Sequence, residues 1–492
     1  MGNIRGLKLG CNDSVAALTE DGAKGDTLRL LDGFQIELKE NIPAGHKVAL
    51  TQIESGETVF KYGCSIGRAI QRIYKGGWIH THNLTSALEV EWTPQWKYCS
   101  PSLKTKIPQR SFMGYRRGKY GVGIRNELWV IPTVSCINDL LRTLIPRYSP
   151  APWIENVRVL AHPYGCSQLG DDFEYTLRAL SSLAFNPNAA GVLFVGMGCE
   201  NLQISYLKER MSHHPNVAYT VLQDEADDER ALFPRLDFLA ENSVRTRAEC
   251  PLSDLVVGVK CGGSDAFSSL TANPLVGLFT DYLSFWGGTT LATEIPEMFG
   301  AEEAITSRIE EESVFNSFVE MIHWFKNYFT SYNQPVYENP SPGNKVGGIT
   351  TLEEKSLGAV EKTGSGPVTD VLWYGERATR PGVAIVFSPG NDPVSVTSLA
   401  ISGAVLTLFT TGRGTPYSSV IPSIKIATNT ALYEKKHRWI DFNAGNLIEG
   451  EGWDNALSRL VTMVIDVANG RSTCNERLKV GEIGLFKNGV IL

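Results

Sequence analysis

The stretch between residues 128 and 222 indicates the class of fold, because four short apolar runs recur in it: LWVIPTV (128–134), VRVLAH (157–162), GVLFVG (191–196) and VAYTVL (217–222). Runs of this length that are rich in β-branched residues are typical of buried strands. Helical stretches such as Asp171–Leu183 lie between them. The alternation predicts βαβ units on a parallel, Rossmann-like sheet and therefore an α/β protein.

Three cysteines follow the first three of these runs: Cys136, Cys166 and Cys199. Ligands of open α/β sheets bind beyond the carboxyl ends of the strands. The positions therefore predict a shared site, and buried structural thiols are the alternative. The nine cysteines of the chain include no CxxC pair, which argues against a disulfide framework.

The remaining sequence extends this domain on both sides. Short strand candidates separated by turn residues make the N-terminal part β-rich, and a stretch rich in Pro, Ser and Lys follows it as a linker. A larger α/β part begins near LVVGVKC (255–261) and carries most of the unusual local sequence. We therefore expect four segments: an N-terminal domain at 1–97, a linker at 98–111, a second domain at 112–248 and a C-terminal domain at 249–492.

Composition excludes several classes of protein. The 492 residues are enough for about two to four domains. The net charge of −7, without a basic cluster, argues against nucleic-acid binding. No run of about 20 apolar residues predicts a membrane span, and no apolar signal core follows the start, so we expect a cytoplasmic protein. Glycine is in excess: the chain has 47 glycines among 492 residues, whereas proteins contain about 7% glycine on average.

Two segments of the C-terminal part combine groups that suit catalysis. KCGGSD (260–265) ends a strand in a cysteine and two glycines, which bring backbone N–H groups close to an anion; a capped turn is the alternative. After a second strand, Glu294, Glu297 and Glu302 lie within nine residues. Such carboxylates suit metal ligation or base catalysis, and an acidic helix start at Pro296 is the alternative.

Several cations lie in loops that are rich in glycine and hydroxyl groups. Lys345, Lys355 and Arg413 can bind a carboxylate, and Lys345 or Lys355, if buried, can instead serve as a base. Ordinary solvated loops are the alternative. His80 and His82 form a His-x-His pair that would place both imidazoles on one face of a strand, spaced to share a metal. The chain lacks GxGxxG, GxxxxGK[ST], HExxH and GxSxG, which argues against dinucleotide and ATP enzymes, zincins and α/β-hydrolases.

Read together, these segments resemble the altronate/galactarate dehydratase family of sugar-acid hydro-lyases over nearly the whole chain. Residues 1–95 resemble the N-terminal SAF domain of that family, a β-clip, and the part after residue 249 resembles its catalytic domain. The motifs that carry the resemblance follow one another in the family's order: Gly114-Tyr115-x-Arg117, Gly123-x-Arg125-Asn126, Gly198-Cys199-Glu200, Cys261-Gly262-Gly263-Ser264-Asp265, Thr271-Ala272-Asn273-Pro274, Asn339-Pro340-x-Pro342-Gly343-Asn344, Glu354-Lys355-Ser356-Leu357-Gly358, Thr410-Thr411-Gly412-Arg413-Gly414 and Pro422-x-Ile424-Lys425.

The resemblance implies dehydration of an aldonate or aldarate, such as altronate or galactarate, to a 2-keto-3-deoxy acid. It also implies ferrous iron and a homodimer. Relatives split sulfolactate and release sulfite, so a sulfo-lyase is an alternative, as is a non-catalytic sugar-acid-binding homologue. The chain departs from the usual motifs at Lys119-Tyr120-Gly121, at Pro163-Tyr164-Gly165-Cys166 and at Ser268-Ser269, where the family commonly has Ser-Gly. These departures leave the substrate open.

Dehydration of this kind needs a base for the proton next to the carboxylate, and a metal with cationic side chains to stabilise the enolate. The resemblance suggests three groups of residues. The catalytic candidates are His82, Lys355, Lys425 and Glu294. The substrate-binding candidates are Arg125, Asn126, Ser264, Asp265, Asn273, Asn344, Lys345 and Arg413. The metal-binding candidates are His80, His82, Cys136, Cys166, Cys199 and Cys261, for mononuclear iron or, alternatively, an iron–sulfur cluster.

Overall fold

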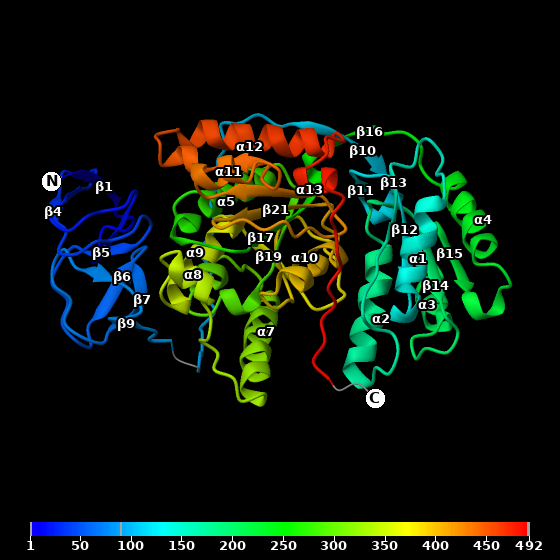
Figure 1. Cartoon of the computed structure of the whole chain (residues 1–492), viewed down its shortest axis with the longest axis horizontal. Helices are drawn as coiled ribbons and strands as arrows, with labels where there is room; N and C mark the ends of the chain where they lie inside the picture. Colours follow the sequence, from blue (N-terminus) through cyan, green and yellow to red (C-terminus); the bar gives the residue numbers. More distant parts are fainter. Residues whose placement is uncertain (1, 89–90, 490–492) are drawn as a thin grey trace.

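A computed structural model describes residues 2–88 and 91–489, which form three domains along the long axis of the molecule (Figure 1). The N-terminal domain consists of short strands around two small apolar cores. Its larger sheet has the order β4-β3-β1-β2-β5-β8 and its smaller sheet the order β6-β7-β9. The strands are β1 (Asn3–Leu7), β2 (Val15–Leu18), β3 (Thr27–Arg29), β4 (Gln35–Glu37), β5 (Lys47–Ala49), β6 (Thr58–Lys61), β7 (Cys64–Ala69), β8 (Trp78–Ile79) and β9 (Leu84–Thr85).

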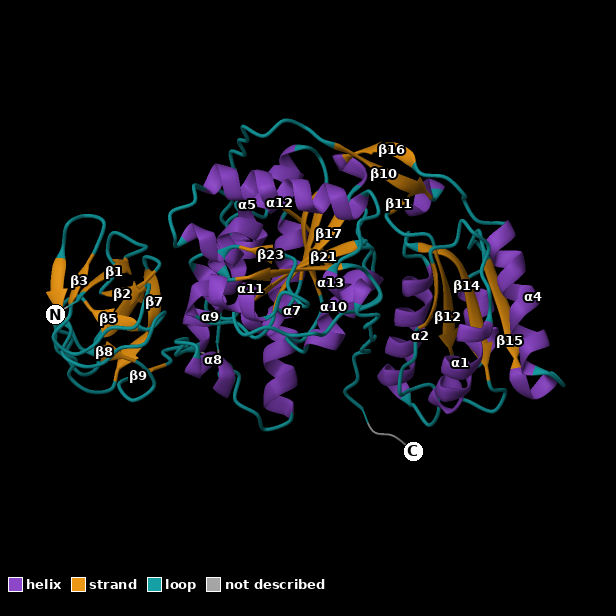
Figure 2. Cartoon of the chain, turned by 45° about the horizontal axis from the view of Figure 1, so that its top comes forward, coloured by secondary structure: helices purple, strands orange, loops and turns teal. Residues whose placement is uncertain are grey.

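The second domain confirms the predicted parallel sheet. Its four strands pair in parallel in the order β13-β12-β14-β15, and every strand coincides with one of the apolar runs. Helices α1, α2 and α4 lie against the sheet in Figure 2, and α3 contacts β14 and β15. The strands are β12 (Glu127–Pro132), β13 (Asn156–Val159), β14 (Ala189–Gly196) and β15 (Val217–Val221), and the helices are α1 (Asn138–Leu144), α2 (Gly170–Ala184), α3 (Ile204–Arg210) and α4 (Asp228–Glu241).

The C-terminal domain is built on a parallel sheet of seven strands with the order β19-β20-β18-β17-β21-β22-β23. Helices α5 and α12 lie on one side of the sheet and α7 and α10 on the other (Figure 1). The strands are β17 (Val256–Cys261), β18 (Thr289–Ala292), β19 (Val368–Leu372), β20 (Gly382–Val386), β21 (Leu406–Thr411), β22 (Ser423–Ala427) and β23 (Phe442–Asn443). The helices are α5 (Ala272–Phe285), α6 (Glu303–Thr306), α7 (Glu312–Ser331), α8 (Pro342–Val346), α9 (Leu352–Val360), α10 (Asp392–Ile401), α11 (Thr430–Lys435), α12 (Trp453–Ala468) and α13 (Cys474–Arg477).

A third small sheet joins the second and C-terminal domains. Strand β10 (Ser111–Arg116) enters the second domain and β16 (Ala248–Pro251) leaves it, and the two pair antiparallel beside β11 (Val122–Gly123). The segment before β10 packs on the C-terminal domain, because the Cys99 N–H donates to Ser307 and the Tyr282 hydroxyl donates to the Pro108 carbonyl. Among residues 2–88 and 91–489, no helix combines the length and apolar composition that a membrane span requires.

Candidate active site

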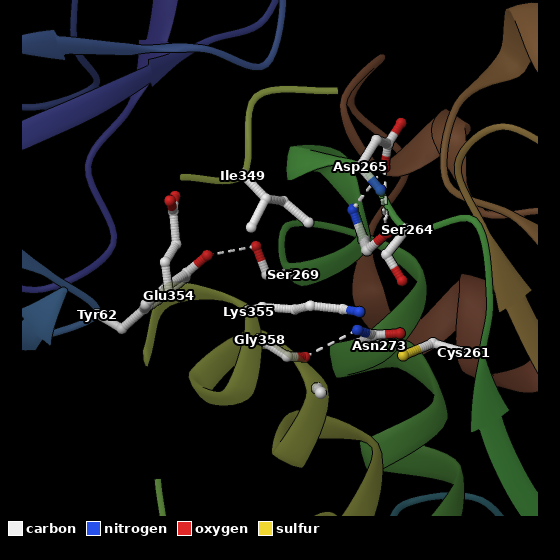
Figure 3. Close-up of a pocket in the computed structure, with 12 residues that line it drawn as sticks. Tyr62, Cys261, Ser264, Asp265, Ser269, Asn273, Ile349, Glu354, Lys355 and Gly358 are labelled. Atoms are coloured by element: carbon white, nitrogen blue, oxygen red, sulfur yellow. Dashed lines mark hydrogen bonds between the residues drawn. The ribbon is translucent and has the colours of Figure 1, made fainter. Parts of the chain in front are cut away.

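A narrow pocket opens at the carboxyl edge of the seven-stranded sheet, where the N-terminal domain meets the C-terminal domain (Figure 3). Strand β17 ends beside it at Cys261, and Tyr62 closes it from the N-terminal domain. Most of the residues that line it have polar side chains: Tyr62, Cys261, Ser264, Asp265, Ser268, Ser269, Asn273, Ile349, Glu354, Lys355, Gly358 and Ala359. The carboxyl edge of a parallel sheet is the usual ligand position in such folds, so this pocket is the candidate active site.

Asp265 is a buried carboxyl group of the pocket that several hydrogen-bond donors hold in place. Its oxygens accept hydrogen bonds from the Thr428 hydroxyl at 3.0 and 3.1 Å, from the Asn429 amide at 3.2 Å and from the backbone N–H of Ser268 at 3.0 Å. Burial nevertheless raises the pKa of Asp265 to about 6, although these donors favour the ionised form. A carboxyl group that titrates near neutrality can act as a general base.

Glycines allow the backbone to approach Asp265 closely. Gly263 has a positive φ of 60°, in the left-handed region, and ends the turn that leads to Ser264. A Cβ atom at Gly412 would lie 2.5 Å from Asp265 Oδ2 and closer still to the rest of the carboxyl group. No residue with a side chain fits there without moving Asp265. Part of the glycine excess therefore serves close backbone approach at the pocket.

A buried ionic cluster lies directly beneath the pocket. Lys260 Nζ lies 2.5 Å from Glu294 Oε1, Lys362 Nζ lies 3.2 Å from Glu294 Oε2, and Lys355 Nζ lies 2.8 Å from Glu297 Oε1. Although burial alone would raise the pKa of Glu294, the two ammonium groups beside it hold that pKa well below its usual value.

Glu294 is also unusual in its backbone. Its φ of 73° lies in the left-handed region, which non-glycine residues adopt at a cost of about 1–3 kcal/mol. Strain of this kind concentrates at functional sites. The backbone and the ion pairs together favour a functional role over that of an ordinary acidic helix start.

Cys261, Glu294 and Glu297 offer ligand atoms that all lie within 4.8 Å of one another, and all three residues are buried. The cluster does not fit a resident divalent cation, because lysines already occupy its donors. Lys362 Nζ lies 2.9 Å from Cys261 Sγ, and the carboxylates of Glu294 and Glu297 each form an ion pair with a lysine. Burial raises the pKa of the Cys261 thiol to about 11, so the thiolate that a metal requires is disfavoured.

The cysteines of the second domain lie in three exposed loops that contact one another. The Ser135 N–H donates to the Tyr164 carbonyl, and the Leu202 N–H donates to the Gly165 carbonyl. Cys136, Cys166 and Cys199 are free and exposed. Thiols without lysine partners fit iron in donor type. Together with the described carboxylates and imidazoles, however, they form no three-ligand group within 4.8 Å. A mononuclear ion requires sulfur atoms about 3.8 Å apart, whereas a cluster accepts wider spacing.

The structure does not support the predicted His-x-His pair. Strand β8 ends at Ile79, so His80 and His82 lie in the following turn and the alternation of a strand does not apply to them. His82 is exposed and packs against Trp78, whereas His80 is half-buried and its Nδ1 lies 3.3 Å from the Thr350 hydroxyl. Among the described residues, neither histidine belongs to a group of three potential ligands.

Arg125 and Asn126 do not line the pocket, and their side chains are bonded within the protein. The Arg125 guanidinium binds Glu476 at 2.7 Å and donates to the carbonyls of Ile124, Val467 and Arg471. The Asn126 amide donates to two backbone carbonyls and its oxygen accepts from Arg117. The polar groups of both side chains are bonded within the protein, which favours a structural role; the prediction that they bind substrate stays untested.

The remaining predicted residues divide between the pocket and its rim. Asn273 lines the pocket, but its amide is bonded to Gly358 and Thr410; the Asn344 amide holds the Ser264 carbonyl at 2.8 Å. Lys345 is partly exposed and Arg413 is exposed. Arg413 donates to the Gly343 carbonyl at 3.1 Å, which places it beside helix α8, the helix that carries Lys345. These two cations therefore lie on neighbouring segments, one in α8 and one in the loop after β21.

Lys425 does not line the pocket. Its side chain is fully buried on β22, with Nζ 3.1 Å from the centre of the Phe409 ring, and Nζ has no hydrogen-bond partner among the described residues. Burial lowers the pKa of Lys425 well below its usual value. Lys425 is therefore buried, but it is not among the residues that line the pocket.

Sequence reasoning missed Lys362 and named Glu297 only as part of an acidic segment. Lys362 follows α9 and binds both Cys261 and Glu294, yet its local sequence, Glu361-Lys362-Thr363, looks like any charged helix end. Only the tertiary fold shows that it is buried. For Glu297 the signal was present, because it lies one helical turn after Glu294.

Three domain models of one family match the chain: the altronate/galactarate dehydratase SAF domain at residues 4–87, the second domain of D-galactarate dehydratase/altronate hydrolase at 114–236, and the C-terminal domain of D-galactarate/altronate dehydratase at 252–491. The altronate dehydratases of Bacillus subtilis (strain 168) and Escherichia coli (strain K12) are 44% and 42% identical to the chain, each alignment covering 99% of both proteins. The chain belongs to the altronate/galactarate dehydratase family. The galactarate dehydratase (L-threo-forming) of Escherichia coli (strain K12) is 34% identical and aligns with 94% of this chain and 93% of its own length.

This membership confirms the predicted family and the predicted enzyme class, a hydro-lyase. It also identifies the N-terminal domain as the SAF domain.

Proposed function

We propose that this family member is a cytoplasmic hydro-lyase that dehydrates an aldonate, with altronate as the first candidate, to a 2-keto-3-deoxy acid. The observation that carries the proposal is the full-length similarity to two altronate dehydratases, which exceeds the 34% identity to the galactarate enzyme. The residue types around the pocket support it, because most of the lining residues have polar side chains and a hydroxylated acid needs many hydrogen-bond donors and acceptors.

The anionic substrate needs a cation, and Lys355 is the pocket lysine. Figure 3 shows its side chain extending from α9 across the pocket toward Cys261 and Asn273. Two of its three donors bind Glu297 at 2.8 Å and Asn339 at 2.9 Å. One N–H therefore remains for the substrate carboxylate. Charge on that carboxylate grows as the neighbouring proton leaves, so an ammonium group held beside it stabilises the transition state.

We assign the base to Asp265, a residue that the sequence placed among the substrate-binding groups. A carboxyl group with a pKa of about 6 is ionised at neutral pH and can accept the proton next to the substrate carboxylate; once protonated, it can return that proton to the departing β-hydroxide, which leaves as water. Thr428 and Asn429 fix its orientation. The hydroxyls of Ser264 and Ser269 line the same pocket and are suited to bind substrate hydroxyls.

We also propose an iron requirement, with Cys136, Cys166 and Cys199 as the residues that would hold the iron. Their thiols fit iron in donor type, whereas the donors around Cys261 are occupied by lysines. When bound, the iron would supply a Lewis acid in the second domain, outside the lining of the pocket that Lys355 and Asp265 share. The steps assigned to Lys355 and Asp265 do not depend on where it binds.

The proposal is tested with purified enzyme, reconstituted anaerobically with ferrous iron and offered altronate, galactarate and sulfolactate. Release of 2-keto acid is measured beside release of sulfite. We expect 2-keto acid from altronate without sulfite; sulfite from sulfolactate would establish the sulfo-lyase instead. No turnover of any substrate by the iron-loaded enzyme would refute the proposal.

Metal analysis tests the iron site separately. We expect the C136S, C166S and C199S variants to lose bound iron and the C261S variant to keep it. The opposite pattern would move the iron to the buried cluster. Iron content is measured directly, so this result does not depend on activity.

A further inference from the structure

Helix α9 carries two consecutive charged residues that serve different parts of the molecule. Lys355 points into the pocket, whereas Glu354 points toward the SAF domain (Figure 3). Two lysines of the SAF domain meet Glu354: Lys47 Nζ lies 2.8 Å from Oε2 and Lys61 Nζ lies 2.8 Å from Oε1. We call Lys47, Lys61 and Glu354 the Glu354 clamp.

The Glu354 clamp is fully removed from water. The side chains of Lys47, Lys61 and Glu354 are 0%, 2% and 1% exposed. One carboxylate faces two ammonium groups, and burial lowers the pKa of Lys47 to about 8. Apolar side chains of similar volume often hold an interface as well as buried ions do. Stability alone therefore does not explain the clamp, and its value lies in the geometry that it imposes.

That geometry extends to the loop that begins α9. Lys47 also donates to the Gly348 carbonyl at 2.8 Å and to the Thr350 hydroxyl at 2.7 Å, and Glu354 accepts from the Thr350 N–H at 2.8 Å. The Thr351 hydroxyl donates to Ile66 of the SAF domain at 2.6 Å and caps α9 by accepting from the Glu354 N–H. The first turn of α9 is thus bonded to the SAF domain on several sides.

We propose that the SAF domain is a positioning element of the active site, and that the Glu354 clamp fixes the first turn of α9 so that Lys355 reaches the pocket. Lys355 is the next residue of the same helical turn, and its ammonium must meet both Glu297 and Asn339. A small rotation of the turn would break these contacts. This inference rests on the function proposed above, because it assigns Lys355 to the reaction.

The test compares the full-length variants E354Q and K61M with the wild type. E354Q leaves two buried ammonium groups without a carboxylate, whereas K61M keeps the pair between Lys47 and Glu354. We expect kcat to fall about 100-fold in E354Q, as for a displacement of about 1 Å, and less in K61M. KM should change less than kcat. Hydrogen exchange should increase across residues 349–360 in E354Q.

A matched control is E54Q, which removes an exposed ion pair of the same domain, between Glu54 and Arg72, at 2.7 Å. This variant should match the wild type in kcat and in exchange. Circular dichroism at the assay temperature confirms that each variant is folded, and if E354Q does not fold, K61M decides the result.

The inference is overturned if the folded clamp variants keep kcat within about threefold of the wild type. Unchanged exchange at residues 349–360 would overturn it as well. If the wild type itself releases no 2-keto acid, the proposed function fails instead. The exchange comparison still tests the clamp in that case, because it needs no substrate.

Discussion

A single added methyl group at Gly412 tests the role of Asp265. The Cβ atom of a G412A variant would lie 2.5 Å from Asp265 Oδ2. Ordinary contacts between such atoms need about 3.4 Å or more, so the carboxyl group must retreat by about 1 Å. Asp265 has little room to move, because Thr428 and Asn429 hold it on the other side.

The displacement sets the size of the expected effect. A base misplaced by about 1 Å loses about 100-fold in kcat. Overpacking at a buried position lowers the free energy of unfolding by about 1–3 kcal/mol. For a domain of this size each kcal/mol corresponds to about 2–4 °C in Tm. The assay measures kcat from the initial rate of 2-keto acid formation, and Tm is measured on the same protein.

The matched control is G343A, in the short helix α8 beside Arg413. A Cβ atom at Gly343 would meet only the Ser341 hydroxyl, at 4.0 Å, and the position has no positive φ. G343A should therefore keep both kcat and Tm. The assignment of Asp265 is refuted if G412A is folded and retains kcat within about threefold of the wild type.

Three further outcomes follow from the buried titratable groups. Because the base must be ionised, kcat/KM should fall as pH drops below about 6, the pKa of Asp265; a profile that is flat from pH 5 to pH 8 would exclude Asp265 as the base. K425M should raise the free energy of unfolding at pH 7 by about 1–3 kcal/mol, because it removes a buried amine without a partner. Because the pKa of Lys425 is lowered in the folded protein, the unfolded chain binds more protons than the folded one. The free energy of unfolding of the wild type should therefore rise with pH toward the unfolded pKa of about 10.4. In denaturant titrations at several pH values, K425M should show a smaller rise. R125M should cost about 3 kcal/mol, by leaving Glu476 unpaired, and should leave KM unchanged; an increased KM would restore Arg125 as a substrate ligand.

The parallel sheets could be predicted from sequence because their strands are continuous apolar runs. Strand β14, for example, is buried at almost every position, so its run GVLFVG carries a strong local signal. Strand β8 shows the opposite case. It comprises only Trp78 and Ile79, and its end before His80 depends on a turn that no periodicity reveals. The His-x-His interpretation failed at that point.

Contacts between residues that are far apart in the chain could not be predicted from the sequence. Lys362 lies 101 positions from Cys261 and 68 from Glu294, so no spacing connects the three. A sequence motif also does not show whether its residues stabilise the fold or take part in the reaction. The motif that contains Arg125 and Asn126 supports the family resemblance, yet in the structure these side chains hold backbone carbonyls and Glu476. A polar motif that marks a family therefore shows that its side chains matter, but it does not show whether they stabilise the fold or bind the substrate.

The three departures from the family motifs differ in their position relative to the pocket. Lys119-Tyr120-Gly121 and Pro163-Tyr164-Gly165-Cys166 lie in the second domain and contribute nothing to the pocket lining, whereas both residues of Ser268-Ser269 line it. Ser269 stands where the family commonly has glycine, and its hydroxyl lies 2.6 Å from the hydroxyl of Tyr62. This departure therefore adds a polar group to the pocket and a hydrogen bond to the SAF domain. Of the three departures, it is the one through which the choice of sugar acid can differ in this pocket.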